Sequence, residues 1–215
     1  MNDCCPPNRY EREFNPRFSR ELTRRYRRGG LTTSARWMVD FAEKVGLDGA
    51  TVLEIGGGIG DIQVEALKRG AAHTTNLELS SAYEDDAVAL LDEAGLRDRA
   101  TRMLGIDLAQ KPDAVDPADF VMLHRVVCCY PDYDRLLSAA ADHAQRAVVF
   151  SHPVQGWAGR IAVRVVNAYC ALMRREYRAF AHSPSAMLTV LRRHGFEPRF
   201  NERSGPWRVV GAVRA

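Results

Sequence analysis

The 215-residue sequence predicts an α/β fold, in which a mostly parallel sheet carries helices on both faces. An apolar segment at residues 52–55 runs directly into a glycine-rich turn at residues 56–60. From residue 51 to residue 151, strand patterns alternate with helix patterns, which indicates a parallel sheet. Two further strand patterns, at residues 196–200 and 207–213, indicate a closing hairpin. Together these observations predict a Rossmann-like sheet of seven strands.

Two helices are expected before the first strand. The first covers about residues 16–28 and ends at Gly29-Gly30. Its apolar residues lie four apart, at Phe18, Leu22 and Tyr26. The second covers about residues 33–45, with a stripe at Trp37, Phe41 and Val45. We therefore expect a helical cap at residues 1–48 and one compact domain at residues 49–215.

The remaining elements follow in alternation. The first five strand patterns lie at residues 51–55, 74–79, 101–104, 119–124 and 147–151. The helices between them are expected at residues 61–69, 81–94 and 132–145. A long helix at residues 157–178 and another at residues 184–195 precede the hairpin. A ligand is then expected beyond the carboxyl ends of the parallel strands.

The glycine turn is the first candidate binding element. Gly56, Gly58 and Gly60 have no Cβ, so a ligand can lie against the main chain, and the next helix begins with free N–H groups. A pyrophosphate-binding turn would place its last glycine where Asp61 stands. Glu54 precedes the first glycine. Carboxylates on both sides of the turn suit a cationic ligand, which favours S-adenosylmethionine over NAD.

Two further acids follow at the ends of the next two strands. Glu78 stands where an acid can accept hydrogen bonds from both ribose hydroxyls. Asp107, after Leu104, Gly105 and Ile106, is placed to accept a hydrogen bond from an adenine amino group. With the glycine turn, these acids predict a site for an adenosine-containing ligand.

Over residues 51–153 this arrangement resembles the class I S-adenosylmethionine-dependent methyltransferases of small-molecule type. The resemblance implies that the last strand enters the sheet antiparallel and that the N-terminal helices cover the cofactor. It also implies a set of cofactor-binding residues, namely Glu54, Gly56, Gly57, Gly58, Gly60, Glu78, Leu79, Ile106, Asp107 and His124. The product would be S-adenosylhomocysteine. A Rossmann-like domain that binds another nucleotide, or nothing, is the alternative.

Three residues are candidates for catalysis or acceptor contact. His124, after the fourth strand, can change protonation near neutral pH. Tyr26, on the helix that should cover the site, has a hydroxyl that can orient an acceptor. His152 is a candidate by position alone, just after the fifth strand. For each residue a structural role stays open: packing on the adenine side for His124, the apolar core for Tyr26, and a buried hydrogen bond for His152.

Several other chemistries are disfavoured. A thiol mechanism at Cys128 and Cys129 lacks any sign of a low thiol pKa, and no set of acidic ligands predicts a metal. The Asn/Asp-Pro-Pro-Tyr type of tetrad that marks methylation of bases or glutamine is absent, since residues 124–127 read His-Arg-Val-Val. The sequence thus favours methyl transfer to a small molecule, preferably to oxygen. A regulatory or scaffold protein that binds the cofactor without turnover is the alternative, followed by an NAD-dependent oxidoreductase.

Composition and charge limit the classes of partner that the sequence indicates. The chain is 46% hydrophobic and 27% charged, and no apolar run approaches the ~20 residues of a membrane span. Its start is polar, which favours a cytoplasmic protein. The net charge of +3 does not indicate nucleic acid. The arginine-rich segment 9–28 and the arginines after Trp157 leave an anionic substrate, peripheral membrane contact and a solvated helix face open. The oligomeric state is left open as well.

Overall fold

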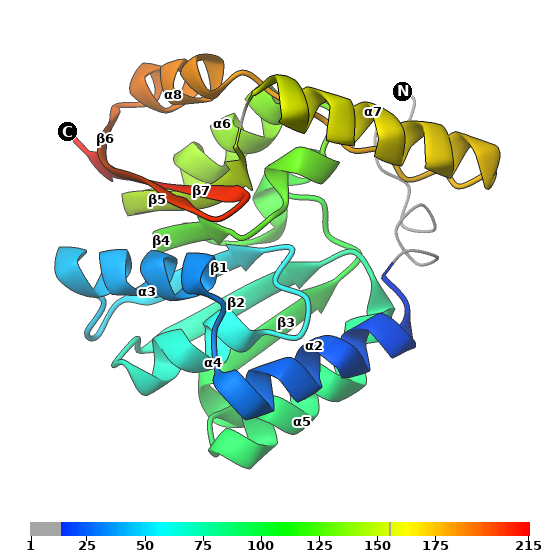
Figure 1. Ribbon diagram of the computed structural model, residues 1–215. Coiled ribbons are helices and arrows are strands. Elements are labelled where there is room, and N and C mark those ends of the chain that lie inside the picture. Colours follow the sequence, from blue (N-terminus) through cyan, green and yellow to red (C-terminus); the bar gives the residue numbers. More distant parts are fainter. Residues whose placement is uncertain (1–13, 155) are drawn as a thin grey trace.

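The computed structural model describes residues 14–154 and 156–215 and contains one seven-stranded sheet (Figure 1). The strands are β1 (Thr51–Ile55), β2 (His73–Glu78), β3 (Ala100–Leu104), β4 (Ala118–Leu123), β5 (Ala144–Pro153), β6 (Phe196–Ser204) and β7 (Trp207–Arg214). They lie in the order β3-β2-β1-β4-β5-β7-β6. Strands β1 to β5 are parallel to one another, and β7 runs antiparallel to both neighbours. The predicted sheet, with its antiparallel last strand, is confirmed.

The described part of the chain forms seven α-helices. They are α2 (Pro16–Gly29), α3 (Thr33–Val45), α4 (Asp61–Lys68), α5 (Glu84–Ala94), α6 (Tyr133–His143), α7 (Trp157–Leu172) and α8 (Pro184–Arg193). The expected long helix at residues 157–178 is shorter, because Arg174 takes a left-handed φ of 51° that a helix cannot continue through. Helix α6 also ends earlier than expected, and β5 begins at Ala144.

The two N-terminal helices have clear start signals. The side chain of Asn15 accepts hydrogen bonds from the backbone N–H groups of Arg17 and Phe18, at 3.0 and 3.1 Å, and Pro16 occupies the first helical position. Gly30 ends α2 with a φ of 68°. Thr32 then caps α3, so both helices form where the sequence predicts them.

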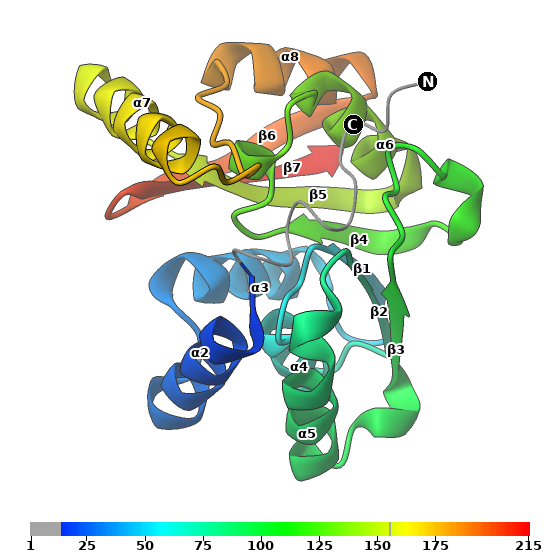
Figure 2. The same ribbon diagram turned by 90° about the vertical axis from the view of Figure 1, so that its right-hand side faces the viewer.

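The strands present alternate side chains to two apolar cores. Leu53, Val121 and Val148 point to one core, which α6 and α8 cover. Their neighbours along each strand point to the other core, which α3 and α4 cover. Figure 2 shows α3 and α6 on opposite sides of the strands. The predicted helices on both faces are therefore present.

Helix α2 lies apart from the sheet and packs beside α5 (Figure 1). The buried Ser19 donates its hydroxyl to the Asp86 carboxylate on α5, and Arg27 pairs with Glu93 of the same helix. The arginines at positions 9 and 12 lie outside the described residues. Within the described ranges, no helix has the length and apolar character needed to cross a membrane.

Candidate functional site

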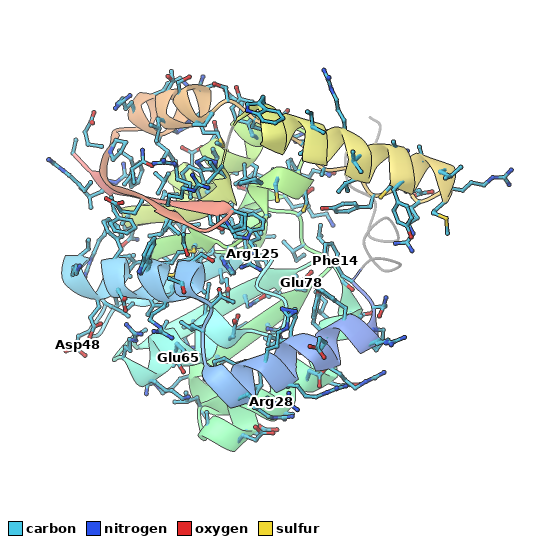
Figure 3. All side chains as sticks on the ribbon, in the orientation of Figure 1. Phe14, Arg28, Asp48, Glu65, Glu78 and Arg125 are labelled. Carbon is cyan, nitrogen blue, oxygen red and sulfur yellow. The ribbon has the colours of Figure 1, made fainter. Side chains whose placement is uncertain are left out.

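A cavity of about 260 Å³ opens at the carboxyl ends of the parallel strands. Its wall is formed by the turns after β1, β2, β3 and β4 and by one face of α2. Phe14, Glu78 and Arg125 lie together around it, in the middle of the molecule (Figure 3). Most of the predicted site residues line this cavity, namely Tyr26, Gly56, Gly57, Gly58, Glu78, Leu79, Ile106, Asp107 and His124.

The glycine turn lies against the cavity, and its backbone conformation or close neighbours disfavour side chains at its glycines. Gly56, Gly58 and Gly60 have φ values of 65°, 53° and 71°, which residues with a Cβ rarely adopt. A Cβ on Gly57 would lie 1.9 Å from Nδ2 of Asn76, and one on Gly56 would lie 2.7 Å from Cγ2 of Val126. The turn therefore brings bare main chain to the cavity, as a close-fitting ligand requires.

The acid before the turn does not reach the cavity. Glu54 is buried beneath the glycines, where its Oε2 accepts a hydrogen bond of 2.9 Å from Nδ2 of Asn76. Burial, with a contribution from nearby Asp61, raises the pKa of Glu54 well above its usual range. Glu54 and Gly60 are absent from the described cavity wall, whereas Asp61 belongs to it. The expected pair of flanking carboxylates is thus reduced to Asp61, whose pKa burial raises to about 6.

Glu78 joins the end of β2 to the glycine turn. Its Oε2 accepts a hydrogen bond of 2.8 Å from the N–H of Gly58, and its Oε1 accepts bonds of 2.8 and 3.0 Å from Leu79 and Ser80. Burial raises the pKa of Glu78. The three backbone donors partly offset this effect, because they stabilise the charged carboxylate. Each carboxylate oxygen still has acceptor capacity for a ligand hydroxyl.

Asp107 is held in a similar way after β3. Its carboxylate accepts hydrogen bonds from the N–H of Ala109 at 3.1 Å and from Nε2 of Gln110 at 2.8 Å. The hydroxyl of Tyr130 contacts both of its oxygens, at 3.2 and 3.0 Å. The segment after β4 therefore orients the acid that follows β3.

His124 lies at the carboxyl end of β4, and its Nε2 is 2.9 Å from the Ser34 hydroxyl on α3. Burial, and then the neighbouring Arg125, lower the pKa of His124 to about 3. The imidazole is therefore neutral at neutral pH. A base with so low a pKa would accept a proton weakly, so the geometry favours hydrogen bonding and positioning.

The other two catalytic candidates differ in position. The ring of Tyr26 lines the cavity, but its hydroxyl donates a hydrogen bond of 2.6 Å to Oε1 of Glu65. Burial and this bond raise the pKa of Tyr26. His152 was expected just after the fifth strand, yet β5 continues to Pro153 and carries His152 into the sheet. It lines a separate small pocket with Cys128 and Phe180, not the main cavity.

Sequence reasoning assigned no role to Arg125. Its φ of 61° is unusual for a residue with a side chain, and its N–H donates to the Ser151 hydroxyl at 2.9 Å. The guanidinium lies over the Trp207 ring, 4.7 Å from its centroid, and lines the cavity. Tyr130, which contacts Asp107, was also given no role from the sequence. The backbone of Arg125 and these contacts between residues far apart in the sequence leave no local sequence pattern.

The thiols near the cavity form their own contacts. The sulfur atoms of Cys128 and Cys129 lie 3.6 Å apart, and that of Cys129 lies 3.1 Å from the Tyr177 hydroxyl. Their mutual contact raises the pKa of Cys128 and lowers that of Cys129. Among the described residues, no cluster of three or more His, Cys, Asp or Glu side chains could hold a metal ion.

No protein-family model matches the chain, and no curated protein matches its sequence. Solved structures do resemble it. Magnesium protoporphyrin IX methyltransferase (ChlM) from Synechocystis PCC 6803, with bound SAH, superposes with a TM-score of 0.73 at 19% identity, over 94% of this chain and 96% of that chain. An O-methyltransferase family protein from Burkholderia thailandensis gives a TM-score of 0.68 at 17% identity, over 92% of this chain and 58% of that one.

The mitomycin 7-O-methyltransferase MmcR also resembles this chain, with a TM-score of 0.63 at 21% identity, over 92% of this chain and 56% of that one. The chain thus spans little more than half of two of these three structures and nearly all of ChlM. At such identities, the likeness establishes a shared fold.

Proposed function

From the class I S-adenosylmethionine-dependent methyltransferase fold that this chain has, we propose that it transfers a methyl group from S-adenosylmethionine to a small molecule, preferably to oxygen. One observation carries the proposal: the glycine turn, Glu78 and Asp107 come from three different strand ends and line one cavity. Ligands of such sheets bind outside the carboxyl ends of the strands. Each of the three has a distinct part of the cofactor to bind.

The described residues fit the cofactor. Glu78 would accept the ribose hydroxyls, because its carboxylate is already fixed at the cavity by three backbone N–H groups. Asp107 would accept the adenine amino group, with Leu79 and Ile106 beside it in the wall. The main chain of the turn around Gly58 would lie along the rest of the cofactor, beyond its ribose and adenine. When bound, S-adenosylmethionine supplies an electrophilic methyl group on a sulfonium.

The buried Glu54 and Gly60, the residue just before α4, would support the glycine turn without lining the cavity. Arg102 donates a hydrogen bond of 2.9 Å to the Gly58 carbonyl while it pairs with Glu84. Glu54 fills the space under Gly57. We therefore assign Glu54 and Gly60 to holding the shape of the turn, with no direct contact to the cofactor.

The acceptor would lie beside α2. The wall that this helix contributes is apolar, with Phe18, Leu22 and the ring of Tyr26, and Phe14 continues it. An apolar wall suits a small organic molecule more than a polar polymer. Small-molecule methyltransferases among the similar structures, including two O-methyltransferases, support the same class of acceptor.

In this proposal the chain contributes mainly by positioning. In-line methyl transfer gains much of its acceleration from holding donor and acceptor in line. Neutral His124, fixed by the Ser34 hydroxyl, would donate or accept a hydrogen bond at the end of β4. Tyr26 would shape the acceptor side with its ring. His152 faces the separate pocket, so we assign it no contact with the acceptor.

Calorimetric titration with S-adenosylhomocysteine tests the cofactor assignment. We expect binding by folded protein, and its absence would refute the proposal. Turnover is tested separately by release of S-adenosylhomocysteine from S-adenosylmethionine across a panel of phenols, carboxylic acids and amines. Methylated product from an oxygen acceptor supports the proposal, whereas tight binding without any turnover would favour a regulatory or scaffold protein.

A further inference from the structure

Helix α7 presents large apolar side chains to solvent. We call Trp157, Ile161, Val165, Tyr169 and Leu172 the α7 stripe. They follow one another at steps of four and then three residues, so they lie on one side of the helix. Trp157 is 80% exposed, Val165 61% and Leu172 81%. Isolated apolar residues are common on protein surfaces, but a continuous row of this size marks an interaction site.

The inward side of α7 is fixed by contacts of Asn167 and Cys170. Asn167 faces the protein, where its Nδ2 donates to the carbonyl of Ala179 at 2.9 Å and its Oδ1 accepts from the N–H of Ala179 at 2.8 Å. Cys170 is buried on the same side. These contacts fix the rotation of the helix and leave the stripe outside. An ordinary surface helix instead buries its largest apolar side chains.

The charged residues of α7 itself and of the turn at residues 173–175 that ends it are all arginines. The sequence from residue 154 to residue 175 contains no Asp or Glu and four arginines, at positions 160, 164, 174 and 175. Arg164 is exposed on α7, and Arg175 lies over the ring of Tyr169, 5.4 Å from its centroid. A second copy of this surface would bring arginine against arginine, which is unfavourable. A surface of negative charge over an apolar layer is complementary.

We propose that α7 docks this protein onto the surface of a membrane that contains anionic lipids. The α7 stripe enters the boundary between headgroups and acyl chains, and Arg164 and Arg175 contact lipid phosphates. Trp157 and Tyr169 are residue types that favour this boundary. At 16 residues the helix is about 24 Å long, which suits a helix lying in the plane of the membrane. In Figure 1 it runs along the edge of the molecule and extends past the sheet, so it is accessible to a flat surface.

The same contact would bring the cavity close to the lipid. The segment after α7 carries Tyr177, which touches Cys129 and packs edge-on against Phe14, with ring centroids 6.0 Å apart. Both Cys129 and Phe14 line the cavity. An apolar acceptor dissolved in the membrane would thus have a short path to the site. Docking itself needs only the surface of α7 and does not depend on the proposed function.

Co-sedimentation of the full chain with vesicles tests the proposal. We would compare vesicles of phosphatidylcholine alone with vesicles that contain equal parts of phosphatidylcholine and phosphatidylglycerol. The test variant is Val165→Glu/Leu172→Glu, at two exposed positions of the stripe. The matched control is Lys44→Glu, which changes the net charge by the same −2 and lies at the end of α3, with no ion pair among the described residues.

We expect the wild type and Lys44→Glu to sediment with the anionic vesicles and to bind neutral vesicles more weakly. The double variant should bind the anionic vesicles at least tenfold less, with an unchanged melting temperature and unchanged affinity for S-adenosylhomocysteine. Equal sedimentation of the double variant and the control would overturn the proposal, as would no sedimentation of the wild type. A wild-type dimer in light scattering that the double variant dissociates would show instead that a second copy covers α7.

Discussion

The carboxylate of Glu78 accepts a 2.8 Å hydrogen bond from the backbone N–H of Gly58, so the acid at the end of β2 and the turn after β1 form one unit at the cavity. Glu78→Gln keeps the size of the side chain and removes its charge. Loss of a charged acceptor of this kind is worth about 1.5–3 kcal/mol, so we expect the affinity for S-adenosylhomocysteine to fall at least tenfold. Calorimetry measures the change. Glu93→Gln, on the exposed side of α5, is the control and should bind normally; unchanged binding by Glu78→Gln would remove Glu78 from the site.

Gly57→Ala should destabilise the protein. The added Cβ would lie 1.9 Å from Asn76 and 2.5 Å from Glu54, and both side chains are buried. Overpacking of this kind costs about 1–3 kcal/mol in the free energy of unfolding, which urea titration measures. Gly29→Ala has no atom within 4 Å of the added Cβ and should leave stability unchanged or slightly higher. Equal stability of the two variants would contradict the crowding described beneath the turn.

Arg102→Met should weaken the support of the glycine turn. The Arg102 side chain is almost fully buried and bonds to both the Gly58 carbonyl and the Glu84 carboxylate. We expect the free energy of unfolding to fall by about 2–3 kcal/mol, as for lost hydrogen bonds of a charged group. Arg27→Met removes an exposed ion pair with Glu93 and should cost less than about 1 kcal/mol. A larger loss of unfolding free energy for Arg27→Met than for Arg102→Met would contradict the supporting role of Arg102 beneath the turn.

His124 should contribute stability that depends on pH. Because the pKa of His124 is about 3 in the folded protein and about 6.5 in an unfolded chain, only the unfolded state gains a proton in this interval. The contribution is therefore complete above about pH 6.5 and is lost as the pH falls towards 3. The stability difference between the wild type and His124→Gln should shrink from pH 7 to pH 4.5, as measured by denaturant unfolding. Titration of the His124 ring signals in NMR spectra between pH 5 and 8 would show that the ring is not buried as neutral imidazole.

Local sequence patterns predicted those parts of the site that each come from one continuous stretch of the chain. The glycine turn, Glu78 and Asp107 each follow a strand that the apolar pattern reveals, and the parallel order of the strands brings them together. Their roles towards the cofactor stay predictions. The position of Glu54 under the turn could not be predicted, because it depends on Asn76 of the neighbouring strand.

Other features depend on contacts between distant residues. His152 was misplaced because β5 continues to Pro153, where pairing with β7 extends the strand beyond its apolar run. The left-handed backbone of Arg125 depends on Ser151, and the orientation of Asp107 depends on Tyr130. The apolar row of α7 was visible in the sequence. Its outward direction was not, since it is set by Asn167 and the segment at Ala179.

The packing of α3 against β7 has a consequence for how the protein is made. Gly211 of β7 lies so close to Phe41 of α3 that a Cβ would come within 2.7 Å of the ring, and Val209 joins the same core. An early helix of the polypeptide is thus covered by the strand of this sheet that is synthesised last. Until residues 207–214 emerge, the apolar side of α3 lacks its partner. The domain is therefore expected to become protease-resistant only once β7 has emerged and paired with α3.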